Sequence, residues 1–534
     1  MKTGKAKPGR QNGASVVLLR RLSQLVFLCA FGFLFLQTDY KGSDTIEYAV
    51  NILFRIDPFL AAITLLATQT FIALMLPALF VLLLALVFGR AFCGWLCPMG
   101  SVLDGCSKIA KQRVKGLPTC YPRLGRIVLF GSLLLALFGV HFAGYVDPFS
   151  ILVRGLVQAF YPAFHAAAES FFTFTYTSAP ASVNNFTEPI YQWLKDTVLP
   201  VDRKYYELAW LSLCILVGIF SLEIIQKRFF CRNVCPVGAM LGLVSRYSLL
   251  HGKGGNKQCG KCRVCSSICR MGAVDDNREM DMSTCNLCFE CVQKCPRQII
   301  SFNYGFKRFA QTGTGLTRRQ FLGIVATGIL LPSVKKVQGL ELRNEPYRIR
   351  PPGAVIEKEF LGKCVRCAEC IQVCIGNALQ PALLEGGIDA IFTPKLVART
   401  GYCEFNCTLC GQVCPTGAIK VLSVAEKHTL KIGHAWFDKN SCLPYAKGIP
   451  CMVCEEHCPT PVKAIQFRET EYAEADGSVK VIKQPYIVDE YCIGCGICEN
   501  KCPLPGKSAI IVTSAGEHRD PKNTLPTAGG SVYG

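Results

Sequence analysis

Cysteine spacing constrains the fold of this chain more than any other feature of its sequence. Of the 32 cysteines among 534 residues, most fall into six groups of four, and four of these groups share the spacing C-x2-C-x2-C-x3-C. Such runs are too cramped and too regular to form a framework of disulfide bonds. They are spaced instead as thiolate ligands of 4Fe–4S clusters. The sequence therefore predicts cysteine-rich domains that fold around iron–sulfur clusters.

Two regular groups follow each other before residue 310, and the second ends in Cys295-Pro296. This tandem is the pattern of two-cluster bacterial ferredoxins, in which the fourth cysteine of each group ligates the other cluster. Zinc is the alternative for any single C-x2-C pair, but two complete groups in tandem argue against it. The predicted ligand sets are Cys259, Cys262, Cys265 and Cys295 for one cluster, and Cys285, Cys288, Cys291 and Cys269 for the other.

Four more groups occupy the second half of the chain, flanked by short strand-like runs at 395–398, 435–437, 486–488 and 509–512. The outer two groups have the regular spacing and the inner two are irregular. This symmetry favours nested pairing, first group with fourth and second with third, over sequential pairing. The predicted ligands of these four clusters are Cys364, Cys367, Cys370 and Cys374; Cys403, Cys407, Cys410 and Cys414; Cys442, Cys451, Cys454 and Cys458; and Cys492, Cys495, Cys498 and Cys502.

The first 250 residues are rich in long apolar runs. The whole chain is 50% hydrophobic and only 18% charged, which is too apolar for an ordinary soluble domain. The runs 22–36, 59–88, 124–142 and 206–225 approach or exceed the roughly 20 residues of a spanning helix. Basic residues cluster before the first run, after the second and after the fourth, so the positive-inside rule places those segments in the cytoplasm.

The chain carries a formal net charge of +20 at pH 7. A basic excess of this size can indicate nucleic-acid binding. No nucleic-acid motif is present, however, and many of the basic residues border the apolar runs. They are typical of topology determinants at a membrane surface. We therefore expect these basic residues to face a membrane surface, and we expect no nucleic-acid partner.

The apolar half is an internal duplication, because an Asp-Pro-Phe motif and a C-x3-C-P motif each occur twice. Two like helix pairs predict packing about a pseudo-twofold axis, which brings the two C-x3-C-P motifs together at the cytoplasmic face. Their four thiols would then hold a seventh cluster or another redox site, form disulfides, or shape the entrance to a quinol site. The repeated residues are Asp57 and Asp147, and Cys93, Cys97, Cys231 and Cys235.

A twin-arginine motif lies past the middle of the chain, at Arg318 and Arg319, and an apolar run follows it. Paired arginines before a short apolar run are typical of a twin-arginine export signal, which carries folded cargo. A basic linker with an apolar patch is the alternative. We expect a short helix over 320–334 that ends at Pro332 and is weakened by Gly323 and Gly328. Everything after residue 351 would then lie outside the cytoplasm.

Together these features predict a membrane α-helical bundle of four helices plus a short fifth anchor, with α+β ferredoxin-like 4Fe–4S domains. The first domain, residues 1–250, is the four-helix membrane domain with both C-x3-C-P motifs. Residues 251–310 form a cytoplasmic two-cluster ferredoxin domain, and residues 311–340 are the signal or anchor segment. Residues 341–534 form a four-cluster ferredoxin domain outside the cytoplasm.

The first half resembles the NapH family of membrane ferredoxin proteins in its four apolar runs, its C-x3-C-P motifs and its paired groups up to Pro296. The second half is similar to the NapG family of exported four-cluster ferredoxins, and MauN- and MauM-type ferredoxins are similar too. The resemblance implies a multi-pass quinol dehydrogenase of the bacterial inner membrane. Its partners would be the quinone pool, a periplasmic reductase or c-type cytochrome, and the twin-arginine translocase.

The motifs do not identify the residues that would bind quinol or accept its protons. They also leave open whether the chain is itself an enzyme. His141 and His165 near the outer face are candidates, although a lone histidine is more often structural. Asp57 and Asp147 are candidates for proton transfer, although capping of a helix beside proline is the favoured explanation for both. Two alternative functions remain: a metal-reducing assembly factor and a regulatory membrane polyferredoxin.

Overall fold

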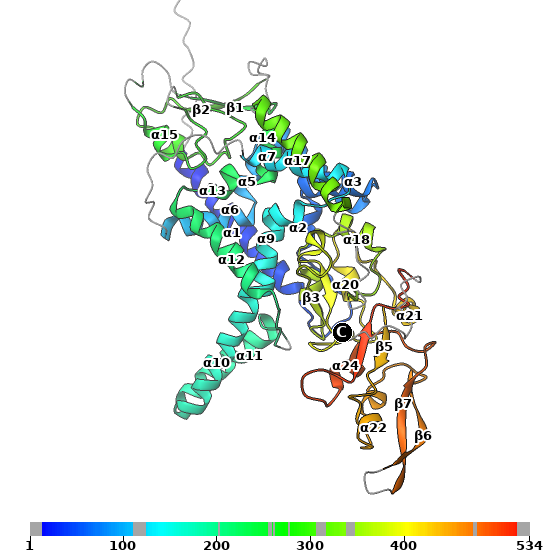
Figure 1. The fold of residues 1–534 in the computed structure, drawn as a ribbon. Coiled ribbons are helices and arrows are strands. Elements are labelled where there is room, and N and C mark those ends of the chain that lie inside the picture. The colour runs from blue at the N-terminus through cyan, green and yellow to red at the C-terminus, as the bar shows by residue number, and fades with distance from the viewer. Residues whose placement is uncertain are drawn as a thin grey trace, which may run out of the picture.

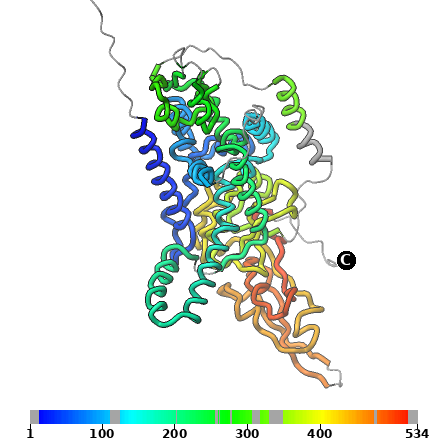
Figure 2. The backbone as a smooth tube through the Cα atoms, turned by 90° about the vertical axis from the view of Figure 1, so that its left-hand side faces the viewer, coloured from blue at the N-terminus to red at the C-terminus, as the bar shows by residue number. Residues whose placement is uncertain are grey.

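The computed structural model describes residues 13–109, 124–200, 203–254, 259, 262–275, 278–305, 317–337, 348–473 and 478–520. Residues 13–249 form a helical domain in the middle of the molecule (Figure 1). The first cysteine-rich unit, residues 250–305, lies at one end of this domain, and the second cysteine-rich unit, residues 348–520, lies at the other (Figures 1 and 2). Helices α10 and α11 form a hairpin that projects from the helical domain.

The helical domain consists of many short helices. Within the described residues, α1 (Gly13–Gln37) is the one helix that is long and apolar enough to cross a membrane. A bundle of four full-length spans is therefore not confirmed. The other helices are α2 Ile52–Arg55, α3 Pro58–Thr68, α4 Pro77–Phe88, α5 Ala91–Trp95, α6 Pro98–Ile109, α7 Leu124–Leu137, α8 Ala143–Val146, α9 Pro148–Gly155, α10 Tyr161–Ser178, α11 Ala181–Thr197, α12 Ala209–Ser221, α13 Phe229–Asn233 and α14 Pro236–Ser245.

The prediction of one helix over 59–88 is wrong, because the chain breaks between α3 and α4. Gln69 ends α3 in the left-handed region, with φ at 54°. The hydroxyl of Thr68 donates to the carbonyl of Thr64 at 2.8 Å, and Pro77 begins α4. Proline fits the first turn of a helix but not its interior, since it has no backbone N–H. Hydropathy alone does not reveal this break.

The internal duplication is confirmed by matching backbone contacts. In the first copy α5 leads into α6, and the N–H of Cys97 donates to the carbonyl of Phe92 at 3.0 Å. In the second copy α13 leads into α14, and the N–H of Cys235 donates to the carbonyl of Phe230 at 2.9 Å. The proline after each of these cysteines begins the next helix. The two motifs are therefore equivalent in structure as well as in sequence.

The twin-arginine segment forms α17 (Arg318–Val337), which packs against α7. The expected end at Pro332 is wrong, because an interior proline removes one backbone hydrogen bond without always ending the helix. Gly328 also has a packing role, since a Cβ there would lie 2.2 Å from a methyl group of Leu134. Residues 311–316 and 338–340 of the predicted segment lie outside the described residues.

The cysteine-rich units contain short helices and two-stranded antiparallel sheets, so the predicted α+β character is confirmed. In the first unit β1 pairs with β2, and in the second unit β3 pairs with β4, β5 with β8, and β6 with β7. All four predicted strand runs overlap observed strands, and only the run 435–437 lies wholly within one. The strands are β1 Leu250–Lys253, β2 Ser301–Tyr304, β3 Leu379–Pro381, β4 Pro394–Leu396, β5 His434–Phe437, β6 Ile465–Ala473, β7 Val479–Ile487 and β8 Ile510–Thr513.

The helices of these units are equally short, and most carry one cysteine of a group. In the first unit they are α15 Val264–Ile268 and α16 Glu290–Gln293. In the second unit they are α18 Glu357–Lys363, α19 Glu369–Gln372, α20 Leu409–Gln412, α21 Val424–Thr429, α22 Leu443–Ala446, α23 Val453–Glu456 and α24 Ile497–Lys501.

Candidate iron–sulfur sites

The cysteines of the first unit gather largely as their spacing predicts. The thiol of Cys265 lies within electrostatic range of Cys259 and Cys262. The thiol of Cys269, the fourth of its own group, lies among the cysteines of the next group. This exchange of the fourth cysteine is the arrangement of two-cluster ferredoxins. We call the predicted ligand sets site A, which is Cys259, Cys262, Cys265 and Cys295, and site B, which is Cys269, Cys285, Cys288 and Cys291.

Backbone N–H groups surround the last cysteine of the first unit. Burial by itself raises the pKa of Cys295, but hydrogen bonds from four following N–H groups, including those of Arg297 and Ile299, bring this pKa below its ordinary value. Cys502 at the end of the second unit is similar: burial opposes the shift, while Ser508 and nearby N–H groups lower its pKa. Donors aimed at a sulfur stabilise the thiolate, which is the form that binds iron.

The thiols of the second unit pair sequentially, so the nested pairing predicted from the spacing is wrong. Cys414 lies within electrostatic range of the first group, and Cys374 lies within range of the second. Cys502 and Cys458 are exchanged in the same way between the third and fourth groups. The resulting sites are site C (Cys364, Cys367, Cys370 and Cys414), site D (Cys374, Cys403, Cys407 and Cys410), site E (Cys458, Cys492, Cys495 and Cys498) and site F (Cys442, Cys451, Cys454 and Cys502).

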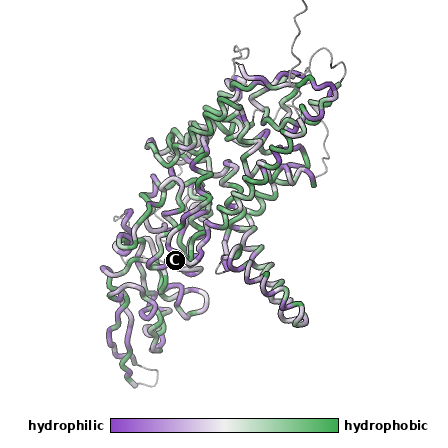
Figure 3. The backbone as a smooth tube through the Cα atoms, turned by 180° about the vertical axis from the view of Figure 1, so that it is seen from behind, coloured by the Kyte–Doolittle hydropathy of each residue, from purple (hydrophilic) through white to green (hydrophobic). Residues whose placement is uncertain are grey.

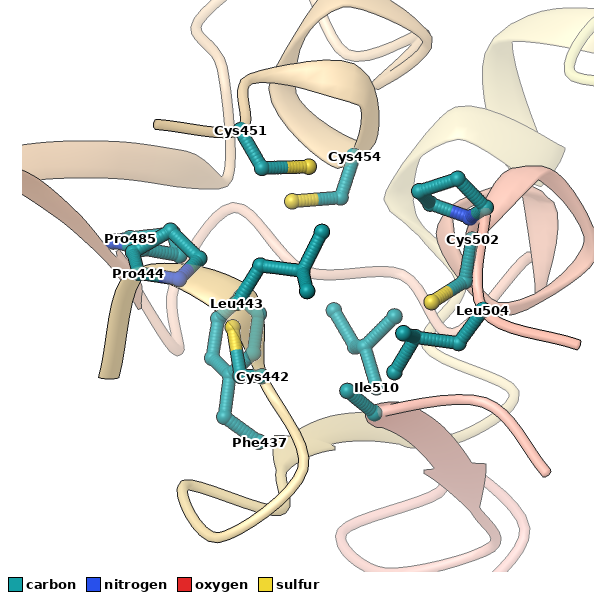
Figure 4. Close-up of a pocket in the computed structure, with 12 residues that line it drawn as sticks. Phe437, Cys442, Leu443, Pro444, Cys451, Cys454, Pro485, Cys502, Leu504 and Ile510 are labelled. Atoms are coloured by element: carbon teal, nitrogen blue, oxygen red, sulfur yellow. The ribbon is translucent and has the colours of Figure 1, made fainter. Parts of the chain in front are cut away.

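Site F is an apolar pocket into which four thiols point (Figure 4). Leu443, Leu504 and Ile510 line the same space. Burial raises the pKa of Cys454 to about 12, so this group is a neutral thiol unless a metal displaces its proton. Site E is a second such pocket, lined by its four cysteines together with Ala435, Ile465 and Val512. Four convergent sulfurs in a dry, apolar space are the donor set that a 4Fe–4S cluster requires.

The four sites of the second unit form a continuous row that leads away from the helical domain. Cys370 of site C interacts electrostatically with Cys410 of site D. The N–H of Cys403 in site D donates to the carbonyl of Cys495 in site E at 2.9 Å. Cys498 of site E interacts in turn with Cys454 of site F. These interactions give the order C, D, E, F, and site F lies near the free end that carries β6 and β7 (Figure 1).

The four cysteines of the C-x3-C-P motifs also come together, as the duplication predicts. Each motif contributes two of these cysteines. We call Cys93, Cys97, Cys231 and Cys235 the axial thiols, after the pseudo-twofold axis that the duplication predicts. The axial thiols interact electrostatically with one another. Cys97, Cys231 and Cys235 are each less than 10% exposed. The N–H of Gly238 donates to the sulfur of Cys235 at 3.3 Å.

Two arginines cross between the copies beside the axial thiols. Arg228 of the second copy donates to the carbonyl of Cys93 at 2.9 Å. Arg90 of the first copy donates to the carbonyl of Cys231 at 3.5 Å. Both guanidinium groups are at least 96% buried. Such buried positive charge offsets the negative charge of thiolates, so this donor set also fits a metal-bound redox group.

Within the described residues, no three His, Cys, Asp or Glu side chains are arranged to hold a single metal ion. A 4Fe–4S cluster is larger than one ion and takes one thiolate at each of four iron atoms. The convergence of four sulfurs around a shared space is therefore the relevant observation for these sites. Cys29 and Cys214 are exposed on apolar helices and belong to no site, and Cys120 lies outside the described residues.

Site C docks directly onto the helical domain through Arg366. This side chain is 1% exposed and donates to the carbonyl of His141 at 2.6 Å and to that of Asp389 at 2.7 Å. Its guanidinium also lies over the ring of Tyr145, 4.5 Å from the centroid. A Cβ at Gly144 would lie 2.4 Å from the carbonyl oxygen of Val365, so only glycine allows this approach. No signal in the sequence identifies this contact.

His141, one of the two candidate histidines, is part of the same contact. It is 2% exposed, its Nε2 lies 3.2 Å from the hydroxyl of Thr64, and its Nδ1 lies 3.3 Å from Arg366. His165 lies on α10 beside Glu169 and Arg203. The structure therefore brings His141 next to a thiol site, whereas His165 lies near the start of α10.

Comparison with known proteins agrees with these sites. A family model described as a 4Fe-4S binding domain matches residues 70–116 and 208–257, which include the axial thiols. A model described as a 4Fe-4S dicluster domain matches residues 448–504, which include most cysteines of sites E and F. No solved structure matches the chain.

Among curated proteins, the methylamine utilization ferredoxin-type protein MauM of Methylorubrum extorquens is 35% identical over 165 residues, which are 28% of this chain and 70% of that protein. The chain belongs to this family of ferredoxin-type proteins. The ferredoxin-type protein NapG of Escherichia coli is 37% identical over 154 residues, 28% of this chain and 65% of NapG. The regulatory protein NosR of Stutzerimonas stutzeri is 25% identical over 219 residues, 40% of this chain and 25% of NosR.

The chain is thus an iron–sulfur electron-transfer protein of the ferredoxin type, and its cofactors are 4Fe–4S clusters. When bound, such clusters accept and donate single electrons, and the surrounding hydrogen bonds and burial tune their potentials. The long apolar α1 and the likeness to NapG and NosR agree with association with a membrane.

Substitution of Cys414 tests the sequential pairing. With alanine at this position, we expect site C to lose its cluster, because Cys414 supplies its fourth thiolate. Iron content should fall by about four atoms per chain. The spectral component that disappears should be the one that Cys364→Ala also removes. If Cys414→Ala instead removes the component that Cys451→Ala removes, the second group pairs with the third and the sequential arrangement is wrong.

Proposed function

We propose that this protein is a membrane quinol dehydrogenase component that passes electrons from quinol to a periplasmic reductase or c-type cytochrome. The observation that carries the proposal is the position of the two cysteine-rich units at opposite ends of α1. A Cβ at Gly13 would lie 2.9 Å from Gln293 in the first unit, and the carbonyl of Phe35 accepts from Gln372 in the second unit at 2.8 Å. These contacts are 22 residues apart, or about 33 Å along a helix, close to the roughly 30 Å of a bilayer core.

The surface between the two units supports a membrane location. Large apolar side chains are exposed on α1 and α4, among them Leu79, Phe80 and Leu83, which are 55–63% exposed. Hydrophobic residues dominate this middle part of the molecule (Figure 3). An exposed apolar surface of this kind is costly in water and favourable in lipid. We propose that the short helices, packed together with α1, form a multi-pass domain of the NapH type.

The position of the axial thiols supports a role between the units. Their loop lies directly on the first unit, where the indole N–H of Trp95 donates to the carbonyl of Leu287 at 3.0 Å. A Cβ at Gly94 would lie 2.1 Å from the carbonyl oxygen of Asn286, so the two loops touch at backbone distance. We propose that sites A to F hold six 4Fe–4S clusters and that the axial thiols hold a seventh redox group.

Reduction by quinol tests this function. The purified protein, oxidised and free of oxygen, should be reduced by a menaquinol analogue, and this is followed by the loss of visible absorbance and by electron paramagnetic resonance. Dithionite serves as the control that shows all clusters can be reduced. Reduction by dithionite but not by quinol, together with reduction of added metal ions, would support the metal-reducing assembly factor instead.

The likeness to NosR favours a regulatory polyferredoxin as the second candidate. Measuring the abundance of other redox proteins in a strain that lacks this protein distinguishes the two functions, because loss of a regulator alters that abundance. A quinol dehydrogenase leaves that abundance unchanged and lowers only the electron flow to them.

A further inference from the structure

Two buried aspartates face each other at the start of the two repeated helices. Asp57 caps α3, where its Oδ1 accepts from the N–H of Phe59 at 2.7 Å. Asp147 caps α9, where its Oδ2 accepts from the N–H of Ser150 at 2.7 Å. The expected capping role is thus confirmed for both. Capping engages only one oxygen of each carboxyl group, however, so it does not account for the other two oxygens.

The two remaining oxygens, Oδ2 of Asp57 and Oδ1 of Asp147, are buried and have no protein donor. Both residues are 0% exposed, and their side chains lie within hydrogen-bond reach of each other. Two ionised carboxylates in such a place repel each other strongly, and a carboxylate without a donor is costly to bury. One proton between the two oxygens satisfies both of them, as in other buried carboxyl pairs.

The pair lies between two thiol sites. On one side, Phe149 at the start of α9 meets the ring of Phe92 edge-on at 6.2 Å, and Phe92 is next to Cys93 of the axial thiols. On the other side, Arg154 interacts with Asp147 and donates to the carbonyl of Arg366 in site C at 3.3 Å. Among charged groups, Arg154 on α9 interacts with Asp147, and Arg366, Tyr145 and Cys367 interact in turn with Arg154.

We propose that Asp57 and Asp147 share one proton at rest and that this pair accepts the protons of quinol at the end of the helical domain that carries site C. The inference rests on the proposed function and specifies where its protons go. Oxidation of a quinol to a quinone releases two electrons and two protons. The two electrons would be taken up one at a time by the redox groups that the axial thiols and the cysteines of site C would hold. The ionised carboxylate takes the first hydroxyl proton and must release it to solvent before it takes the second.

The test replaces each aspartate by asparagine. Asparagine also caps helices well, so Asp57→Asn and Asp147→Asn should keep the starts of α3 and α9. Loss of a positioned proton acceptor typically costs about 100-fold or more in rate, so reduction of the clusters by a menaquinol analogue should slow by at least about 100-fold. Reduction by dithionite should be unchanged. Asp44→Asn, at an exposed position of the same domain, is the matched control and should behave as the unmodified protein.

Infrared spectroscopy of the resting protein gives a readout that does not depend on turnover. The difference between the spectrum of the unmodified protein and that of each asparagine variant should contain the carbonyl band of one protonated carboxyl group, because other buried carboxyl groups, such as that of Glu369, contribute equally to both spectra. Variants that react with quinol at the unmodified rate and keep the band would overturn the inference and leave the proposed function intact. An unmodified protein that dithionite reduces but quinol does not would overturn the proposed function, and with it the role of the pair.

Discussion

Replacing Arg318 and Arg319 by lysine is expected to keep the second cysteine-rich unit in the cytoplasm and to abolish electron delivery outside. Twin-arginine signals are read by a translocase that requires the guanidinium pair, and lysine does not reproduce its planar donor geometry. In the unmodified protein, a protease added to spheroplasts should remove epitopes placed beyond residue 351. It should spare epitopes between residues 278 and 305, because the first unit lies at the opposite end of α1.

The lysine variant should protect both units from the protease. Lysine in place of the exposed Arg203, which lies outside the twin-arginine segment, is the matched control and should leave the cleavage pattern unchanged. Protection of the second unit in the unmodified protein would show that the segment is not used for export. The acceptor would then be cytoplasmic, although the docking of the second unit on the helical domain would still hold.

Replacing Arg366 by alanine is expected to uncouple the second unit from the helical domain. The substitution removes donors from the buried carbonyls of His141, Cys364 and Asp389. Of these three bonds only the one to His141 reaches the helical domain, and a hydrogen bond from a charged group contributes about 1.5–3 kcal/mol, so the docking free energy should weaken by about that amount. Reduction of sites C to F by quinol should be almost lost, whereas dithionite should still reduce them.

Arg399→Ala is the matched control for Arg366→Ala. Arg399 also donates to backbone carbonyls, those of Glu499, Cys502 and Leu504, but it lies wholly within the second unit. Its loss should destabilise that unit without affecting the contact with the helical domain. If Arg366→Ala and Arg399→Ala slow reduction by quinol to the same extent, the effect is one of folding, and the docking role of Arg366 is wrong.

Local spacing predicted the first unit better than it predicted the second. The exchange of Cys269 into site B follows from a short tandem in which both groups are regular. In the second unit the symmetry of regular and irregular groups suggested nesting, but spacing within a group does not determine which group packs against it. The second and fourth groups do touch, because the N–H of Cys403 in site D donates to the carbonyl of Cys495 in site E. These two groups exchange no cysteine, however, so this contact joins two separate pairs of sites.

The structure of the helical domain was also predicted only in part from the sequence. Its duplication was visible and correctly implied the convergence of the axial thiols, because two equal motifs pack about one axis. The break at Gln69 was missed, since the short polar stretch Thr68-Gln69-Thr70 was included in the long apolar run 59–88 and the turn depends on one backbone conformation. The contact of Arg366 with His141 joins residues 225 positions apart and carries no motif, so only the fold reveals it.

The most direct test of outward electron transfer follows where the electrons of one quinol go. The oxidised protein is mixed with one equivalent of a menaquinol analogue, frozen within one turnover and studied by electron paramagnetic resonance. We expect signals from the second unit, and these signals should change in Cys414→Ala and disappear in Arg366→Ala. Signals confined to sites A and B, with the second unit still oxidised, would contradict the proposal that this protein carries electrons from membrane quinol outward.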